Sequence, residues 1–323
     1  MDDKKVIVKI DASFSKGRDL FDTIKKYAKH SNEEFAWWDE FAFTVEDLPE
    51  YDALLIFNNP SGKTETICYP ENVIAFMMEP GVRAEHPWMF KGLDQYAKVF
   101  SPLQNSSNTV LSHGYLGWHF SHNYTFFEQL AVPEKKNRIS CITSTLSQLK
   151  GHQLRVAFVK MLGRELPEID FFGKGSFFLP DKLDALLPYC YSIAIENSAA
   201  PYYFTEKIND CFLAYTVPVY YGCSNIEKYF PEKSFIRIDI KNPGKAIELI
   251  KEIILHDNWE ERLEAVKEAR ELVLNKYQPL AGAAAVWRET QRSMQKKKIL
   301  TAPVPQTIQK KITQLIGKLT GNQ

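Results

Sequence analysis

The sequence predicts an α/β protein in which two domains follow one another. Its 323 residues exceed what one simple core needs and fit two domains of ordinary size. Short apolar stretches alternate with amphipathic helical stretches, as in parallel sheets joined by crossover helices. The alternation is interrupted by the polar segment VPEKKN (132–137) and then starts again. We therefore expect a first α/β domain at 1–135, a second at 136–290 and a tail at 291–323.

The first domain contains apolar stretches of strand length and one clear amphipathic helix. The predicted helix spans 17–30, GRDLFDTIKKYAKH. The predicted strands are VIVKI (6–10), ALLIF (53–57), VIAFM (73–77) and KVFS (98–101).

The second domain repeats this rhythm. The predicted strands are 138–143, 169–173, 191–196, 217–222 and 234–239, and the predicted helices are 151–166, 183–187, 205–215, 244–257 and 258–277. Paired α/β units of this kind bind ligands at the carboxyl ends of their strands and in the crevice between domains. The functional residues are therefore expected to face that crevice.

Composition excludes several classes of partner and compartment. Lys plus Arg and Asp plus Glu number 40 each, so no overall field attracts nucleic acid, and none is expected as a partner. The five cysteines lack CxxC spacing and favour a reducing compartment. The first residues, MDDKKVIVKIDASF, have only a short apolar strand after their charges, so we expect neither a signal peptide nor a membrane span there. A cytoplasmic protein is the expectation.

Two polar clusters flank the aromatic stretch at 198–204. Glu196 and Asn197 stand at the carboxyl end of the strand YSIAIE, where their side chains suit a ribose or a base edge. The alternative is that they are turn-forming polar residues that finish the strand. Thr205 is a good helix N-cap, and a helix start carries free N–H groups and partial positive charge. Lys207 adds a full charge, so this helix start would hold a diphosphate, the alternative being a solvated surface lysine.

The ordered spacing of these residues resembles the carboxyl-terminal signature of α-1,3-fucosyltransferases, glycosyltransferase family 10. The chain follows it through IENSAAPYYFTEKINDCFLAYTVPVYYG (195–222) and through the PxxSFI element at 231–236. One departure is Tyr215, where the family often has Gly, and it concerns local helix packing. Membership of this family, in its bacterial type, implies a GT-B type glycosyltransferase with two Rossmann-like domains facing a cleft.

The resemblance also assigns residues. In GHQLRVAFVKML (151–162), Arg155 matches the family's diphosphate-binding arginine. In NVIAFMMEPGV (72–82), Glu79, immediately after the strand, matches its general base. The element HGYLGWHF (113–120) offers Tyr115 and Trp118 as acceptor-side aromatics, or equally as core residues. Glu206 would contact the fucose or the ribose, or merely favour the helix start. The donor-binding set implied by the resemblance is Arg155, Glu196, Asn197, Tyr203, Thr205, Glu206 and Lys207.

The resemblance implies inverting transfer of L-fucose from GDP-fucose to a glycan hydroxyl, O3 of GlcNAc in N-acetyllactosamine or a surface polysaccharide, giving an α-1,3 linkage. Since a diphosphate is already a good leaving group, positive charge rather than a general acid would support its departure. The sequence has no DxD motif and no histidine spacing typical of a metal site, so neither metal nor cofactor is expected. A transferase for another nucleotide sugar and a non-catalytic nucleotide- or glycan-binding homologue are the alternatives.

The tail turns basic at RSMQKKK (292–298) and then predicts a helix in QTIQKKITQLIGKLTG (306–321). Its apolar residues fall on one helical face and its lysines lie away from that face. A basic amphipathic helix can lie on an anionic membrane, here the inner face of the cytoplasmic membrane, or its apolar face can pack on the protein or on another subunit.

Overall fold

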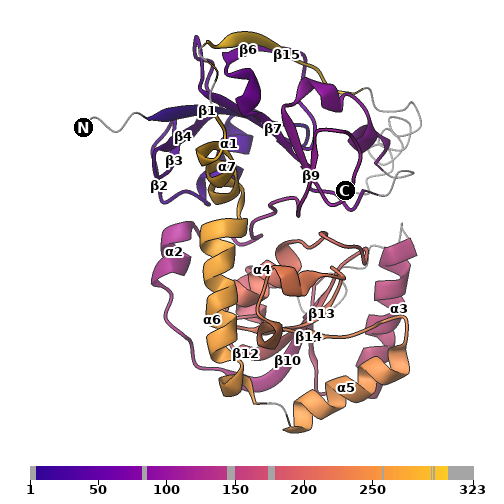
Figure 1. Cartoon of the computed structure of the whole chain (residues 1–323). Helices are drawn as coiled ribbons and strands as arrows, with labels where there is room; N and C mark the ends of the chain where they lie inside the picture. The colour runs from indigo at the N-terminus through magenta and orange to yellow at the C-terminus, as the bar shows by residue number, and fades with distance from the viewer. Residues whose placement is uncertain are drawn as a thin grey trace.

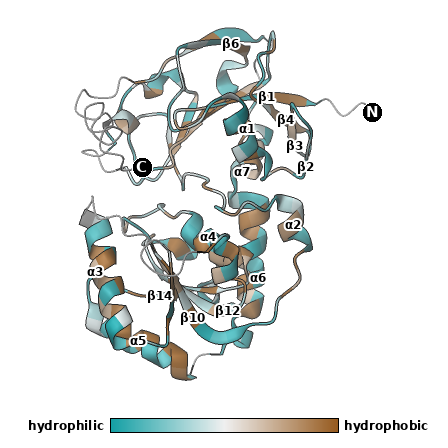
Figure 2. Cartoon of the chain, turned by 180° about the vertical axis from the view of Figure 1, so that it is seen from behind, coloured by the Kyte–Doolittle hydropathy of each residue, from teal (hydrophilic) through white to brown (hydrophobic). Residues whose placement is uncertain are grey.

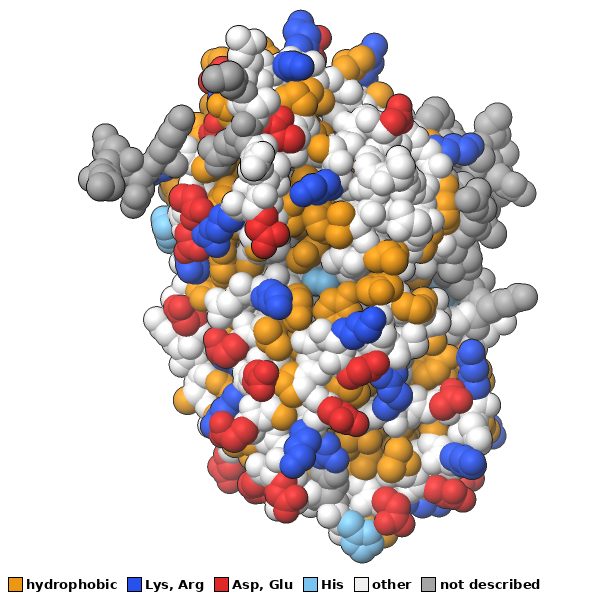
Figure 3. Space-filling view, viewed as in Figure 1, with side chains coloured by type: hydrophobic (Ala, Val, Ile, Leu, Met, Phe, Trp, Pro, Cys, Tyr) orange, Lys and Arg blue, Asp and Glu red, His pale blue; other side chains and the backbone are white. Residues whose placement is uncertain are grey.

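The computed structural model describes residues 5–81, 86–143, 150–173, 179–256, 258–291, 293 and 295–304. Two α/β units lie one above the other, and the chain crosses between them more than once (Figure 1). Hydrophobic side chains gather across the level at which the two units meet (Figure 3). The predicted fold class, two α/β domains in tandem, is confirmed.

The N-terminal unit is built on an eight-stranded sheet in the order β2-β3-β4-β1-β5-β7-β8-β9. Neighbours from β4 to β9 pair in parallel, whereas β3 pairs antiparallel with both β2 and β4. The strands are β1 (Val6–Ala12), β2 (His30–Ser31), β3 (Ala36–Trp38), β4 (Phe41–Thr44), β5 (Ala53–Phe57), β7 (Val73–Phe76), β8 (Lys98–Ser101) and β9 (Thr109–Leu111).

Both faces of this sheet are covered, which explains its apolar central strands. Helix α1 (Gly17–Lys25) buries Leu20, Phe21 and Ile24. A separate cluster lies on the opposite face and contains Leu54, Ile56 and Cys68. Cys68 belongs to β6 (Thr64–Cys68), which pairs antiparallel with β15 (Lys297–Thr301).

The C-terminal unit is a five-stranded parallel sheet in the order β11-β10-β12-β13-β14. Every residue of the central strand β12 is buried, as expected for an apolar strand covered on both faces. Its strands are β10 (Lys136–Ile142), β11 (Asp170–Phe172), β12 (Tyr189–Ile195), β13 (Val217–Tyr221) and β14 (Ile236–Arg237). Its helices are α3 (Lys150–Glu165), α4 (Glu206–Leu213), α5 (Pro243–His256) and α6 (Leu263–Leu272).

Helices α3 and α5 carry hydrophilic and hydrophobic residues along their length, and α5 buries Ala246, Ile247, Ile250 and Ile253 (Figure 2). The two units also contain short 3-10 turns: Pro70–Asn72, Pro87–Phe90, Leu93–Gln95, Lys182–Ala185, Ile226–Lys228, Glu232–Ser234 and Trp259–Glu261.

The chain crosses between the units near α2 (Tyr124–Gln129) and again after α6, where a π-helical turn (Val273–Tyr277) leads into α7 (Pro279–Arg288). Helix α7 packs on the N-terminal unit, not on the sheet before it in sequence. The Trp287 Nε1 group donates to the carbonyl oxygen of Asn72 at 3.1 Å, and the Trp287 ring stacks on Phe41.

The observed arrangement therefore differs from the predicted domains at their C-terminal end. Residues 279–288 were expected in the second domain and 297–301 in a separate tail, but both segments join the N-terminal unit. Pro279 starts a new helix because it cannot continue the preceding one. The close packing of α7 requires Gly282, since a Cβ there would lie 2.2 Å from the Tyr115 ring. The predicted tail helix at 306–321 lies outside the described residues.

None of the helices that the structure describes combines the length and apolarity needed to cross a membrane.

Tyr215 adopts a left-handed backbone conformation, with φ 55°, just after α4. Glycine favours this region, and other residues pay a conformational cost there. Three contacts hold the tyrosine: its hydroxyl donates to the carbonyl oxygen of Leu130, its carbonyl accepts from Trp259, and its ring packs under Arg270. These contacts stabilise, after the end of α4, a backbone conformation that glycine would adopt without strain.

Candidate active site

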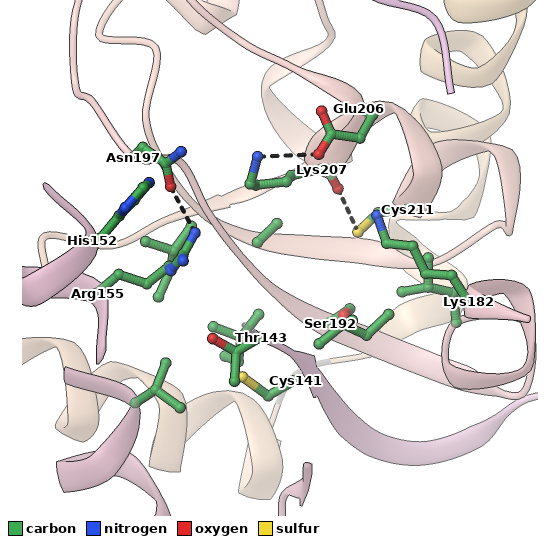
Figure 4. A pocket seen from close by; sticks show the side chains of 16 residues that line it. Cys141, Thr143, His152, Arg155, Lys182, Ser192, Asn197, Glu206, Lys207 and Cys211 are labelled. Carbon is green, nitrogen blue, oxygen red and sulfur yellow. Dashed lines mark hydrogen bonds and ion pairs between the residues drawn. The ribbon is translucent and has the colours of Figure 1, made fainter. Parts of the chain in front are cut away.

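A pocket of about 330 Å³ opens at the carboxyl ends of β10 and β12 (Figure 4). His152 and Arg155 enter it from α3, Glu206 and Lys207 from the start of α4, and Lys182 from the turn before β12. The full lining is Cys141, Ile142, Thr143, His152, Arg155, Val159, Lys182, Leu186, Ser192, Ile193, Ala194, Ile195, Asn197, Glu206, Lys207 and Cys211. This is the position at which parallel α/β sheets bind ligands.

Arg155 faces Asn197 across the pocket. Its Nη1 donates to Asn197 Oδ1 at 2.6 Å, although only 7% of the arginine is exposed. Burial lowers the pKa of Arg155, and the charge of Glu196 opposes this effect, so the guanidinium stays charged. Gly151 allows α3 to approach this loop, since a Cβ at that residue would lie 1.7 Å from the carbonyl oxygen of Asn197.

Thr205 caps α4, as its sequence position predicts. Its Oγ1 accepts from the backbone N–H of Lys207 at 3.4 Å and donates to the Glu196 carboxylate at 2.8 Å. Its own backbone N–H donates to Glu196 Oε1 at 2.8 Å. Glu196 therefore ties the end of β12 to the start of α4.

The contact of Glu196 with the donor stays a prediction, and in this structure its carboxylate is held inside the protein. Glu196 is 1% exposed, does not line the pocket, and its oxygens are taken by Thr205 and by Lys207 Nζ at 3.3 Å. A carboxylate in contact with a diphosphate would repel the diphosphate. A carboxylate that contacts Lys207 without lining the pocket holds the lysine in place. Glu196 is thus a positioning residue.

Lys207 is held between two carboxylates, with Nζ 3.1 Å from Glu206 Oε1 as well as 3.3 Å from Glu196 Oε2. Burial would lower the pKa of Lys207, but the charges of Glu196 and Glu206 outweigh it and raise that pKa. Burial likewise opposes ionisation of Glu206, yet the charge of Lys207 keeps the pKa of Glu206 well below its usual range. Both groups are ionised, and Lys207 presents a fixed cation to the pocket.

Lys182 is a third cation in the pocket, and sequence reasoning missed it. Its Nζ lies 2.5 Å from Oδ2 of Asp210, whose carboxylate is fully buried, while 26% of the lysine side chain is exposed. Asp210 and the neighbouring charge of Glu206 raise the pKa of Lys182 against the effect of its burial. The short predicted helix around 183–187 gave no sign that Lys182 would meet a residue 28 positions away.

Tyr203 lies in the C-terminal unit and Glu79 in the N-terminal unit. Tyr203 is buried and lies outside the pocket lining, so its donor contact stays a prediction. Glu79 follows β7 in the N-terminal unit, with 43% of its side chain exposed and His86 Nε2 3.4 Å from its Oε2. Burial, then the charges of Glu196 and Glu79, raise the pKa of Tyr203. The role of Glu79 as general base stays a prediction.

The two predicted acceptor-side aromatics differ in burial. Trp118 is 0% exposed, packs edge-on against Tyr27 and donates from Nε1 to the carbonyl oxygen of His122. That prediction is wrong, because a fully buried indole cannot contact a sugar. Tyr115 stacks on Phe76 with ring centroids 4.3 Å apart and packs against α7 at Gly282. It is partly buried, so the core alternative holds for Trp118 and the acceptor-side role of Tyr115 stays a prediction.

The pocket thus presents Arg155, Lys182 and Lys207 beside the first turn of α4, each held by an acceptor from the same unit. Such an array is suited to a dianionic group such as a diphosphate. Across the described part of the chain, no three His, Cys, Asp or Glu side chains form a group that could hold a metal ion.

Comparison with known proteins relates the segment that carries this pocket to a family. Residues 132–262 match the model of the glycosyltransferase family 10 (fucosyltransferase) C-terminal domain. The Alpha-(1,3)-fucosyltransferase FucT of Helicobacter pylori is 37% identical over 79 residues, which are 24% of this chain and 16% of that protein. A human 3-galactosyl-N-acetylglucosaminide 4-alpha-L-fucosyltransferase is 26% identical over 193 residues.

The human match covers 57% of this chain and 50% of that protein. The chain thus spans about half the length of the human relative, and its match to FucT spans a smaller share of that protein. A solved α1,3-fucosyltransferase matches with a TM-score of 0.50 and 16% identity, over 85% of this chain and 91% of that one. At that identity the likeness supports the fold, two α/β domains of GT-B type. The segment 132–262, which contains every pocket residue, matches glycosyltransferase family 10, the fucosyltransferase family.

Proposed function

We propose that this protein is an inverting glycosyltransferase that moves L-fucose from GDP-fucose to a glycan hydroxyl. The observation that carries the proposal is the pocket of fixed cations, Arg155, Lys182 and Lys207, inside the family 10 segment. The fucosyltransferase relatives support fucose as the transferred sugar. The acceptor we propose is O3 of GlcNAc in an N-acetyllactosamine-like or polysaccharide glycan, giving an α-1,3 linkage.

The reaction is a single displacement at the anomeric carbon of fucose. The acceptor oxygen forms the new bond to that carbon as the bond to the β-phosphate oxygen breaks, which inverts the configuration. Glu79 takes the proton of the attacking hydroxyl, because a sugar hydroxyl is a poor nucleophile until its proton is removed. GDP leaves with the electron pair of the broken bond.

Positive charge stabilises the departing diphosphate. Arg155 can bind phosphate oxygens through two N–H groups, and Lys207 and Lys182 add point charges whose positions are fixed by buried carboxylates. The first turn of α4 contributes backbone N–H groups and its partial charge. These groups supply the charge that a divalent ion supplies in other nucleotide-sugar transferases, so we propose that no metal or other cofactor is required.

The test is nucleotide release by the purified protein with GDP-fucose, GDP-mannose and UDP-sugars, each with N-acetyllactosamine, with and without chelator. We expect GDP release from GDP-fucose that rises with acceptor and survives chelation. Arg155→Ala and Lys207→Ala should weaken both GDP binding and transfer. Activity only with another donor would keep the fold and refute fucose as the sugar.

A transferase for another nucleotide sugar is the second candidate, because the three cations would bind the diphosphate and do not select the sugar. A non-catalytic nucleotide- or glycan-binding homologue would bind GDP in calorimetry and release none from any donor. For location we propose the cytoplasm, with the basic tail either on the inner face of the cytoplasmic membrane or packed on the protein.

A further inference from the structure

His152 is a pocket residue that the mechanism above does not use. It lies in the first turn of α3, three residues before Arg155, so the two side chains share a face of the helix. His152 is 9% exposed, and its Nδ1 is buried with no hydrogen-bond partner among the described residues. Buried polar atoms are rarely left without partners, which suggests a ligand at this place.

The charged groups that face His152 are positive. Arg155 comes from its own helix and Lys207 from α4, while the loop after β12 contributes the neutral Asn197. Burial, then these two charges, lower the pKa of His152, so the imidazole is neutral in the empty pocket near pH 7. The carboxylates of Glu196 and Glu206 are engaged by Lys207, so no described carboxylate pairs with His152.

A bound diphosphate would reverse this balance. Its negative charges would lie against Arg155 and Lys207 and offset them, and its oxygens can accept a hydrogen bond from a protonated imidazole. The orphan Nδ1 would gain the partner that it lacks. Both effects favour the imidazolium form only while the donor is bound.

We infer that His152 takes up a proton when the donor diphosphate enters the pocket and then binds it as an additional cation. The inference rests on the proposed function, since it needs a nucleotide diphosphate in this pocket. His152 would therefore be a specificity residue for the dianionic donor, and it would make donor affinity depend on pH.

The sign of this dependence follows from linkage. A group whose pKa is higher in the complex than in the free protein strengthens binding below its free pKa, and this gain is lost as pH rises through its pKa in the complex. Each pKa unit by which the complex exceeds the free protein corresponds to a tenfold change in affinity. Between about pH 6 and 8 we therefore expect the affinity of wild type for GDP-fucose to fall about tenfold more than the affinity of a variant without the imidazole.

The experiment is titration calorimetry of the full chain with GDP-fucose, without acceptor, in two buffers of different ionisation enthalpy. The phosphates of this donor are diesters and stay ionised, so the difference in heat between buffers counts protons taken up by the protein. We expect uptake by wild type and its loss in His152→Asn and His152→Gln, whose amides cannot be protonated. His256→Asn is the matched control, because its side chain is 71% exposed at the end of α5.

The outcomes separate the inference from the proposed function. Absence of GDP-fucose binding by wild type overturns the proposed donor and the inference with it. Binding without proton uptake by wild type overturns the inference alone and needs no variant. Uptake that persists in both His152 variants, with melting temperatures near wild type, assigns the proton to another group and also overturns it.

Discussion

Replacing Lys182 by Met tests whether the buried ion pair beneath the pocket stabilises the fold as its geometry implies. Asp210 is fully buried and meets Lys182 Nζ at 2.5 Å, and its other oxygen accepts from the backbone N–H of His119 at 3.1 Å. Methionine keeps much of the length of the side chain and removes its charge. The variant therefore leaves a buried carboxylate with one neutral hydrogen bond.

The expected loss of stability is large for a single substitution. Removing one partner of a buried ion pair costs about 3–5 kcal/mol because the other charge stays buried without compensation. The lower end applies here, since the His119 N–H remains and 26% of the lysine side chain already reaches solvent. A loss of about 3 kcal/mol corresponds to a fall in melting temperature of about 6–12 °C for a domain of this size.

Thermal unfolding at neutral pH, followed by circular dichroism, measures this loss. Lys160→Met is the control, because Lys160 is an exposed lysine on α3. The double variant Lys182→Met/Asp210→Asn should recover at least half of the loss, since the neutral amide still accepts from His119. A single variant that melts within about 2 °C of wild type would refute the reasoning, because surface substitutions rarely change stability more than this.

The pH dependence gives an independent check on the same pair. Burial raises the pKa of Asp210, and loss of Lys182 would raise it further. A carboxyl group whose folded pKa exceeds its unfolded value costs stability above that pKa, and the cost disappears as pH falls through it. The gap in melting temperature between wild type and Lys182→Met should therefore narrow at acid pH.

Glu79→Gln should lower transfer about a hundredfold or more while GDP affinity stays near wild type, and wild-type turnover would remove Glu79 as the base. Gly151→Ala should weaken GDP binding about tenfold in calorimetry, because its Cβ would lie 1.7 Å from the Asn197 carbonyl and must displace that loop. Gly244→Ala is its control, since a Cβ there meets nothing within 4 Å, and equal affinities would contradict the prediction. Truncation before Pro305 should abolish co-sedimentation with anionic liposomes if the tail binds membrane, and unchanged sedimentation would refute that attachment.

The elements predictable from sequence are those whose pattern is local and strong. The buried strands β5, β7 and β12 are predominantly apolar runs. The start of α4 is predicted by Thr205 as N-cap and Glu206 in the first turn. Strands β2 and β3 are very short, and β15 is defined by a partner more than 200 residues earlier in the chain. Such pairings leave no periodic signal, so they could not be read from the sequence.

The site shows the same division between local and long-range information. Arg155 and Lys207 could be placed because helix position and family resemblance both point to them. The role of Glu196 could not, because its hydrogen bonds to Thr205 depend on how the loop at 197–204 folds back. His152 could have been found from its i, i+3 spacing to Arg155, whereas Lys182 needed the fold to bring it to Asp210.

Helix α4 joins these observations, because one short element serves both the pocket and the contact between the two units. Its first turn presents Lys207 to the pocket, while Asn209 Nδ2 donates to the carbonyl oxygens of Leu116 and Gly117, and Asp210 accepts from His119 N–H. The segment 116–119 belongs to the stretch that leads out of the N-terminal unit, the unit that contains Glu79. A shift of α4 would therefore displace Lys207 and Asp210, the partner of Lys182, and would loosen the segment leading from the unit of the proposed base. The buried Glu196 fixes the start of α4, and the buried Asn209 and Asp210 fix its middle against the segment 116–119.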